Sequence, residues 1–474
     1  MNAMTKLIES SSSLPSTQLP DAAIDSAEEP GTPDEGDAFE DTFGERMSMS
    51  SASKTVNQTS LALVLVNVFL SGVSLTLVIP VLPKLLILAL GGNASSAAYY
   101  QGSIQFFGGI IEIFAAPFWG RLSDSIGRKP VLLIALLGLC AEMLLIYFFW
   151  HNVVIFIAAR MLASAAGVYF STLSTIYADL SAGTGREAQT YGISGAVFGM
   201  SFICGPIAGG LLEKKGTGLA VLASAFCLML SFVFAVLFVP ETSSGVIADP
   251  FLRASSVLER VQSIRIAEMD ANPFPRVLKL LRDPVLSRLA QAMMLDGLAF
   301  GGLQSVFFFF TSIRFGWDSS EAGMFFALVG VCMLVGQGLL TPLFSQRFPD
   351  RAVILFGYFV ETVHWLIYAL AMTPGMLYFG LCVGALGYPA GPTIKGVVAR
   401  QVQPEEQGTV QGSLAALQIM VRPVSPLLAN SVFAFFTSAA APVFFPGAPF
   451  VVCAVLSSLS LIIASRALSN PDLK

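Results

Sequence analysis

The sequence predicts an all-α integral membrane protein. Of its 474 residues, 54% are hydrophobic and only 12% are charged, a balance far outside that of soluble domains. The apolar residues gather in long runs, and roughly 20 such residues cross a bilayer core of about 30 Å as a helix. The strands of a membrane barrel would instead show segments of about ten residues in which apolar and polar residues alternate. The long apolar runs therefore predict helices.

Dividing the chain by this length predicts twelve transmembrane helices, and the longest internal connection separates them into two sets of six. The predicted spans are residues 61–90, 97–120, 131–150, 153–178, 189–212, 218–239, 286–312, 321–344, 352–372, 375–399, 408–436 and 443–465.

The ends and the middle of the chain differ from the spans in composition. The first 60 residues hold eleven acids against three bases and are rich in Ser and Pro, so we expect a disordered tail. The start shows no signal-peptide pattern, which leaves the first span to direct insertion. In the central loop, Val257, Val261 and Ile264 share one helical face, which fits either a surface helix or a plain linker. The expected parts are a tail at 1–60, a half at 61–240, a loop at 241–285, a half at 286–466 and a short tail at 467–474.

The basic residues predict the orientation. With twelve spans both termini share a side, and the segments on that side hold 18 Lys or Arg residues against 4 on the other. The positive-inside rule then places both termini and the central loop in the cytoplasm. Plasma, vacuolar and endosomal membranes all remain open. Asn93 heads a glycosylation sequon on the outer side but lies so close to the membrane that its use stays undecided.

Several classes of function find no support. Outside the first 60 residues, 23 bases against 20 acids give no basic surface for nucleic acid. The six cysteines lie inside apolar runs at no metal-like spacing, so we interpret them as packing residues and expect no metal site. Phosphate-binding glycine loops, paired-histidine motifs and nucleophile elbows are all missing, so we expect neither an enzyme nor a cofactor.

The loop between spans two and three carries a specific motif, GRLSDSIGRKP, with Gly120, Asp124, Gly127, Arg128 and Lys129 at ordered positions. The glycines permit a tight turn, and the two basic residues supply charge on the inner side. This motif resembles the signature loop of the major facilitator superfamily. The resemblance implies that fold, with two six-helix halves, and a loop that latches the cytoplasmic ends of the halves in one transport state.

Further stretches narrow the resemblance. Tyr177-Ala178-Asp179 is similar to drug:proton antiporters, and the stretches at 314–318 and 406–414 resemble the tetracycline exporters and the hippocampus-abundant-transcript transporters. Ser71 and Met333 stand where the tetracycline exporters have an acid and a histidine, so we do not expect tetracycline export itself.

Span five contains a run of small residues and one proline, which are Gly205, Pro206, Gly209 and Gly210. Pro206 removes a helical hydrogen bond, and the glycines let helices approach closely. An antiporter-type hinge and simple tight packing are both compatible with this pattern.

Ionisable residues inside the spans are costly and are therefore candidates for function. Glu142 and Glu361 occupy positions where the resemblance places membrane acids, so they are the leading candidates for proton coupling. Glu112 and Asp296 are two further candidates. By the resemblance, Arg160 pairs with a nearby acid or adjusts its proton affinity.

Other polar residues of the spans are candidates for the substrate cavity. Lys395 and Arg422 could balance Glu361 or attract an anionic substrate, and the sequence does not choose between these roles. His364 follows Glu361 by three residues and either shares its proton or packs as a hydrogen-bonded histidine. The cavity candidates are Ser71, Met333, Gln337, His364, Lys395 and Arg422.

The sequence therefore predicts a secondary active transporter that rocks its two halves about a central cavity. Proton-coupled antiport of a small organic molecule out of the cytoplasm is the preferred mechanism. The alternatives are a facilitator or symporter of a metabolite such as a sugar or organic anion, and a membrane receptor or scaffold that transports nothing. The expected partners are the lipid bilayer, the substrate and protons, and the fold predicts a monomer.

Overall fold

The computed structural model describes residues 59–181, 187–243, 283–401, 414 and 417–469, all within one compact unit at residues 56–474. The described residues form helices and turns and contain no strand, which confirms the all-α prediction. The predicted acidic tail, the surface helix of the central loop and most of the motif at 406–414 lie outside the described residues.

The N-terminal half, residues 59–243, begins with a helix over 59–77. Asn93 and Asn152 start the helices that follow them by accepting hydrogen bonds from backbone N–H groups of the first turn. The remaining helices of this half are α2 (Leu82–Ala89), α3 (Ala94–Ile126), α4 (Arg128–Phe149), α5 (Val153–Ala165), α6 (Tyr169–Ser181), α7 (Glu187–Lys215) and α8 (Leu219–Phe238).

The C-terminal half, residues 283–469, repeats this helical architecture. Asp283 caps its first helix and Gly316, at a positive φ of 69°, ends it. Its elements are α13 (Pro284–Phe315), α14 (Ser319–Val335), the π-helix η2 (Gly336–Leu340), α15 (Thr341–Arg347), α16 (Asp350–Ala369), α17 (Pro374–Ala385), α18 (Ala390–Arg400), α20 (Val424–Thr437) and α21 (Ala448–Ala467).

Ten helices among the described residues are long and apolar enough to cross a membrane, compared with the twelve that the sequence predicts. The predicted span at 97–120 is helical within the 33-residue α3, whose serines, glutamines and glycines make it less apolar. The predicted span at 375–399 is wrong as one continuous helix. It is broken into α17 and α18 at residues 386–389, where Gly387 and Pro389 interrupt the helical hydrogen bonds.

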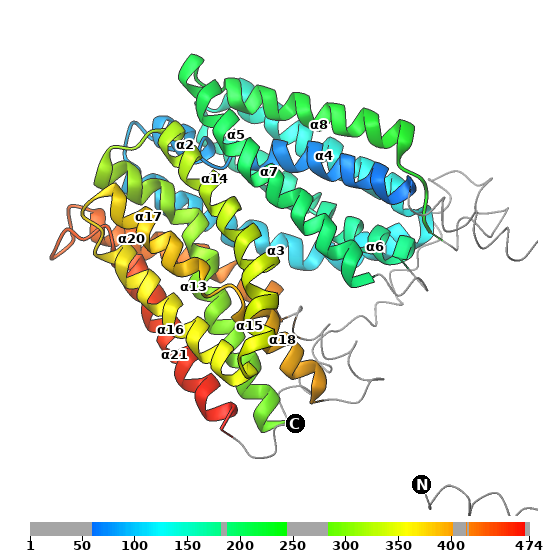
Figure 1. The fold of residues 1–474 in the computed structure, drawn as a ribbon. Helices are drawn as coiled ribbons and strands as arrows, with labels where there is room; N and C mark the ends of the chain where they lie inside the picture. The colour runs from blue at the N-terminus through cyan, green and yellow to red at the C-terminus, as the bar shows by residue number, and fades with distance from the viewer. Residues whose placement is uncertain (1–58, 182–186, 244–282, 402–413, 415–416, 470–474) are drawn as a thin grey trace, which may run out of the picture. The chain divides into compact units, whose positions relative to one another are not determined.

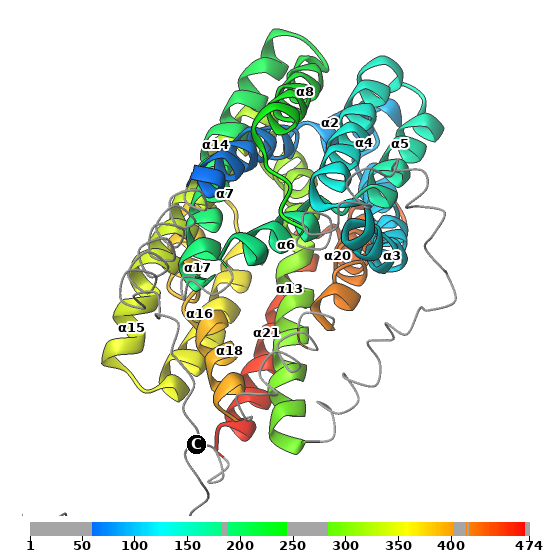
Figure 2. The ribbon, with the colours of Figure 1, turned by 90° about the vertical axis from the view of Figure 1, so that its right-hand side faces the viewer.

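The first seam between the halves joins α3 to α20, which run antiparallel side by side (Figure 2). Ser95 donates or accepts a 2.8 Å hydrogen bond with Thr437. Seven residues further along α3, a Cβ at Gly102 would lie 2.9 Å from the Asn430 side chain. Another seven residues on, a Cβ at Gly109 would lie 2.5 Å from the Pro423 ring. This seven-residue spacing on both helices resembles a coiled-coil contact.

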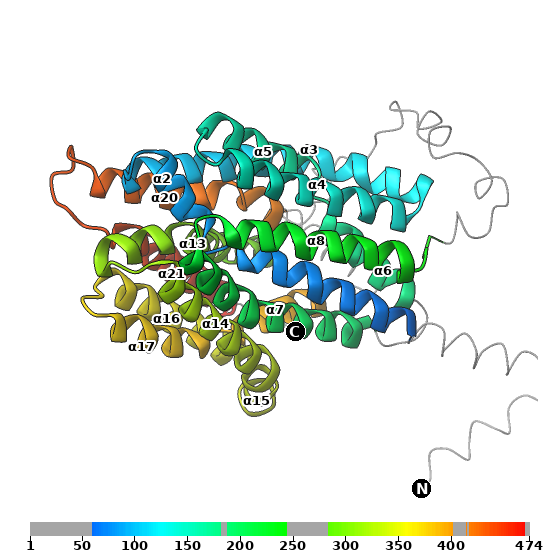
Figure 3. The ribbon, with the colours of Figure 1, turned by 90° about the horizontal axis from the view of Figure 1, so that it is seen from above.

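The second seam joins α7 to α14, which also lie side by side (Figure 3). A Cβ at Gly210 would lie 2.5 Å from Cα of Ser320, and a Cβ at Gly323 would lie 2.2 Å from the carbonyl oxygen of Pro206. Such distances are shorter than real contacts, so glycine is required here for the two backbones to approach.

The bundle has two chemically distinct ends. We call one the short-loop end; it carries the turns at residues 90–93, 216–218, 316–318 and 438–447. The other, the basic end, carries residues such as Arg128, Lys129, Arg347 and Arg400. Ser95–Thr437 and Gly210–Ser320 hold the halves together at the short-loop end. Toward α6 and α18, at the basic end, the two halves diverge (Figure 1).

Candidate functional site

Glu142 and Arg160 form an ion pair inside the N-terminal half. The Glu142 side chain, on α4, is 2% exposed, and its Oε1 lies 2.5 Å from Nη1 of Arg160 on α5. Arg160 therefore pairs with a nearby acid, which is one of the two roles that the resemblance implied for it. Because α4 and α5 belong to the same half, this acid keeps its counter-charge whenever that half moves as a body.

Asp296 and Glu361 meet inside the C-terminal half. Asp296 lies in the middle of α13 and Glu361 in the middle of α16, and their buried carboxyl groups lie close enough to interact with each other. Oδ1 of Asp296 is buried and receives a hydrogen bond from no described residue. The buried Tyr358 lies close enough to interact electrostatically with both carboxyl groups. Among the described residues, no lysine or arginine forms an ion pair with either acid.

Two carboxylates in contact repel each other, whereas a single proton held between them converts the repulsion into a hydrogen bond. This pair is therefore chemically suited to bind one proton. The sequence named each acid separately but gave no signal that they meet.

Glu112 and Arg422 form the third charged pair, and it joins the two halves. Oε1 of Glu112, on α3, lies 3.7 Å from Nη1 of Arg422, in the turn before α20. The Glu112 side chain is 41% exposed and that of Arg422 is 69% exposed. The pair continues the α3–α20 seam toward the basic end, one helical turn beyond Gly109.

His364 and Ser71 are engaged in packing. Nδ1 of His364 lies 2.7 Å from the carbonyl oxygen of Gly380 on α17, and its ring fills the space where a side chain at Gly384 would stand. Ser71 is fully buried, donates to the carbonyl oxygen of Asn67 and contacts the Tyr169 hydroxyl.

The other cavity candidates are spread over the C-terminal half. Met333 is half-buried near the end of α14, and Gln337 is exposed in the π-helix that follows. Lys395 is exposed on α18. The π-helix contacts the break between α17 and α18, since a Cβ at Gly336 would lie 2.3 Å from the Tyr388 ring. Irregular backbone of this kind is frequent at functional sites.

The signature loop is organised by Arg128. Its Nη1 donates to Asp124 at 2.5 Å and to Ser123 at 3.1 Å, and its Nε donates to Asp179 at 3.2 Å. Gly127 adopts a φ of 107°, which side-chain-bearing residues rarely reach. The loop's contacts among described residues thus lie within the N-terminal half, so its predicted latching of the two halves stays a prediction.

Glu241, which follows α8, contacts this loop and was missed by sequence reasoning. Its carboxylate accepts hydrogen bonds from the backbone N–H groups of Arg128 and Lys129, at the start of α4. A carboxylate at a helix N-terminus is favourable for the helix dipole. The available signal was an isolated acid two residues after the last apolar residue of span six.

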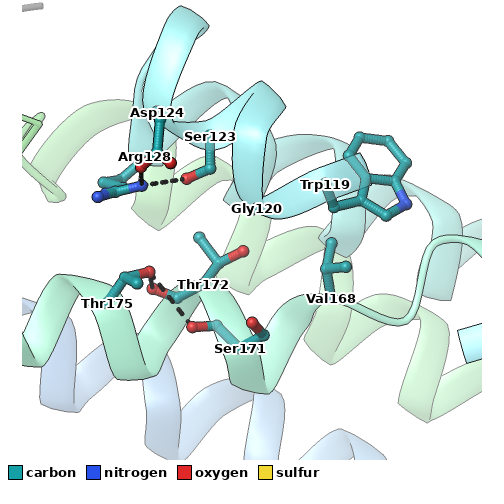
Figure 4. A pocket seen from close by; sticks show the side chains of 9 residues that line it. All are labelled: Trp119, Gly120, Ser123, Asp124, Arg128, Val168, Ser171, Thr172 and Thr175. Carbon is teal, nitrogen blue, oxygen red and sulfur yellow. Dashed lines mark hydrogen bonds and ion pairs between the residues drawn. The ribbon is translucent and has the colours of Figure 1, made fainter. Parts of the chain in front are cut away.

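A cleft of about 100 Å³ lies beside the loop, between the end of α3 and α6. Figure 4 shows Ser123, Asp124 and Arg128 on one side and the hydroxyls of Ser171 and Thr172 on the other. Arg128 already donates hydrogen bonds to Ser123 and Asp124 on α3. We therefore interpret this cleft as part of the signature loop itself.

The small residues of α7 pack tightly. Cβ atoms at Gly205 and Gly209 would lie 2.0 Å from Oγ1 of Thr76 and 1.9 Å from the carbonyl oxygen of Leu77. These two glycines bring α7 against the first helix, and Gly210 brings it against α14. Pro206 lies inside α7, which continues as a helix on both sides.

One ion pair between the halves lies at the short-loop end. Lys214 Nζ is 3.7 Å from Oδ2 of Asp318, which also caps α14 by accepting from the N–H groups of Ser320 and Glu321. Partial burial acts to raise the pKa of Asp318. Hydrogen bonding, first with the Glu321 side chain, and the charge of Lys214 outweigh it and hold that pKa below its ordinary value.

Known proteins resemble the chain in sequence. The profile of the Major Facilitator Superfamily matches residues 64–418. The class C tetracycline resistance protein of Escherichia coli is 28% identical over 382 residues, covering 79% of this chain and 90% of that protein. The mouse hippocampus abundant transcript 1 protein is 24% identical over 341 residues, covering 71% of this chain and 66% of that protein.

Solved structures share the fold. The human organic anion transporter MFSD10 (TETRAN) superposes with a TM-score of 0.59 at 22% identity, covering 86% of this chain and 99% of that one. The nucleoside transporter NupG gives a TM-score of 0.66 at 12% identity, covering 87% and 99%. With the family profile matching most of the chain, this multi-pass membrane protein belongs to the Major Facilitator Superfamily of transporters.

Proposed function

We propose that the protein is a proton-coupled antiporter that exports a small organic molecule from the cytoplasm by alternating access. Its family supports secondary transport, and the curated relatives include proteins named for tetracycline resistance. The positive-inside rule supports assigning the basic end to the cytoplasm. In that orientation, a bundle that is joined at the short-loop end and diverges at the basic end corresponds to the cytoplasm-facing state.

The contact between Asp296 and Glu361 carries the proposal of proton coupling. These acids meet in the middle of two membrane helices, and no described basic residue neutralises them as Arg160 neutralises Glu142. A pair of this kind holds a proton in one state and releases it when water reaches the pair in another. Proton movement is thereby tied to the rocking of the halves.

Transport by purified protein in liposomes under an imposed pH gradient tests the proposal. We expect a compound from a panel of amphipathic molecules to accumulate only with the gradient. Asp296→Asn and Glu361→Gln should each abolish accumulation while downhill exchange continues. Asp350→Asn is the control, because it removes an exposed carboxylate that pairs with Arg400 at the basic end.

Equal flux with and without the gradient, together with unchanged behaviour of both variants, would instead establish a facilitator. The exposed Arg422 and Lys395 favour an organic anion as the cargo in that case. No flux for any compound would favour a receptor or scaffold.

A further inference from the structure

Glu112 and Arg422 form a charged pair that neither half contains alone. Glu112 belongs to α3 of the N-terminal half, and Arg422 precedes α20 of the C-terminal half. The close approach of Gly109 and Pro423 fixes their position, since each charged residue lies within one helical turn of that contact. The pair therefore exists only while this part of the α3–α20 seam is closed.

The position of Glu112 around α3 shows that it faces away from lipid. Phe107 and Phe114, which are 58% and 77% exposed, mark the outward face of the helix. At 100° per residue, Glu112 lies about 140° from Phe107 and about 160° from Phe114. Its 41% exposure therefore opens toward the interior, between the halves.

Arg422 lies beside Glu112 on this inner side and is even more exposed. Its distance of 3.7 Å from Glu112 exceeds the 2.7–3.2 Å range of hydrogen bonds. No described residue accepts a hydrogen bond from its guanidinium, so the donors of that group are available. The N–H donors of a guanidinium lie in one plane, so they can form two parallel hydrogen bonds to the two oxygens of a carboxylate.

The depth of Arg422 suits a molecule that arrives from the basic end. Thr437 ends α20 at the short-loop end, and Arg422 precedes it by 15 residues. At 1.5 Å per residue this is about 22 Å, most of the way across a core of about 30 Å. An organic anion that enters between the halves from the basic end therefore meets Arg422 before it reaches the middle of the bundle.

We propose that Arg422 binds the carboxylate of an organic anion in the state described here, and that Glu112 is the resident counter-charge which the anion displaces. This inference rests on the proposed function as a transporter and specifies the class of its cargo. It requires no proton coupling and can therefore fail or hold independently of it.

The test measures modification of Arg422 by phenylglyoxal, an arginine reagent, with mass spectrometry of the purified protein. Benzoate is the probe, and benzamide is its uncharged match in size and shape. We expect millimolar benzoate to slow the modification at least threefold and benzamide to leave it unchanged. Protection by both compounds equally, or by neither, would overturn the proposal.

Two variants examine the role of Glu112. Removing a partly exposed ion-pair partner should strengthen benzoate protection in Glu112→Gln by about 1.5- to 5-fold in apparent Kd. Arg351→Gln, which removes an exposed cation at the start of α16 that donates to Ser469, should leave protection unchanged. Weaker protection in Glu112→Gln would show that Glu112 organises Arg422 rather than competing for it, and would refute displacement.

The benzoate-protection test and the pH-gradient experiment can give different outcomes, so the two proposals can be tested separately. Gradient-driven accumulation without benzoate protection would keep the antiporter and reject this site. Benzoate protection without any effect of the gradient would keep the site and assign it to a facilitator.

Discussion

Gly210 is the position where the structure makes its sharpest prediction about transport. Its substitution by alanine would place a Cβ 2.5 Å from Cα of Ser320 and 2.6 Å from the carbonyl oxygen of Ser319. Ordinary contacts begin near 3.4 Å, so α14 would have to retreat by roughly 1 Å. Both neighbours are backbone atoms, which cannot rotate away as a side chain can. The strain therefore falls on the state in which the short-loop end is closed.

Overpacking of this kind costs about 1–3 kcal/mol. In the alternating-access mechanism that we propose, the other state separates α7 from α14 at this end, so the cost shifts the equilibrium between states by about 5- to 150-fold. A tenfold shift would reduce a closed population of about 90% to about 50%.

Cross-linking on the other seam can measure this shift. Ser95→Cys and Thr437→Cys replace two hydroxyls that lie 2.8 Å apart, so oxidation should join them only when the short-loop end is closed. We expect Gly210→Ala to lower the cross-linked fraction markedly. The distance of this reporter from Gly210 ensures that it senses movement of whole halves.

Gly195→Ala is the matched control, because it lies on the same helix and its Cβ would meet nothing within 4 Å. Both substitutions gain the same intrinsic helix propensity, up to about 1 kcal/mol, which therefore cancels in the comparison. Equal cross-linking in the two folded variants would refute the reasoning that the α7–α14 seam controls the state.

Three further predictions concern stability, each measured by thermal unfolding in detergent. Glu142→Gln should cost about 3 kcal/mol because it strands the Arg160 cation, and adding Arg160→Leu should recover most of the loss; no recovery would contradict the pairing. The depressed pKa of Asp318 means that its contribution is complete above its ordinary value near 4 and disappears as pH falls through the lower folded-state value. Asp318→Asn should therefore flatten the loss of Tm between pH 5 and 3, and an unchanged slope would exclude this carboxylate. Gly127→Ala should cost about 1–3 kcal/mol because its φ of 107° is strained for any side chain, and an unchanged Tm would show that the loop relaxes freely.

The fold was predictable because span length and the signature loop are local features of the sequence. Ten of the twelve predicted spans correspond to helices that meet the length and composition needed to cross a membrane. The break between α17 and α18 was also visible in principle, since Gly387 and Pro389 lie inside the predicted span. A long apolar run masked it, because run length alone cannot distinguish one helix from two.

Contacts between helices were harder to predict from the sequence. Periodicity assigns Asp296 and Glu361 to faces of their helices, but it does not say that α13 and α16 turn those faces toward each other. The contact between Glu142 and Arg160 was easier to predict, because their helices are consecutive and are joined by a short turn at residues 150–152. For His364 the sequence left two roles open, proton sharing with Glu361 and packing as a hydrogen-bonded histidine. The structure shows the hydrogen bond, with the carbonyl oxygen of Gly380 2.7 Å from Nδ1.

The three pairs of membrane charges differ in what rocking can do to them. Glu142 and Arg160 belong to one half, so a rigid-body movement leaves their distance unchanged and gives them little means to sense the transport state. Glu112 and Arg422 belong to different halves, and their separation must change when the seam opens. Asp296 and Glu361 also share one half, but in the mechanism that we propose their partner is a proton rather than a fixed cation, so access of water alone can change their charge. We infer that state dependence enters through the Glu112–Arg422 and Asp296–Glu361 pairs. Glu142, one of the two leading candidates from sequence, would then serve stability rather than coupling.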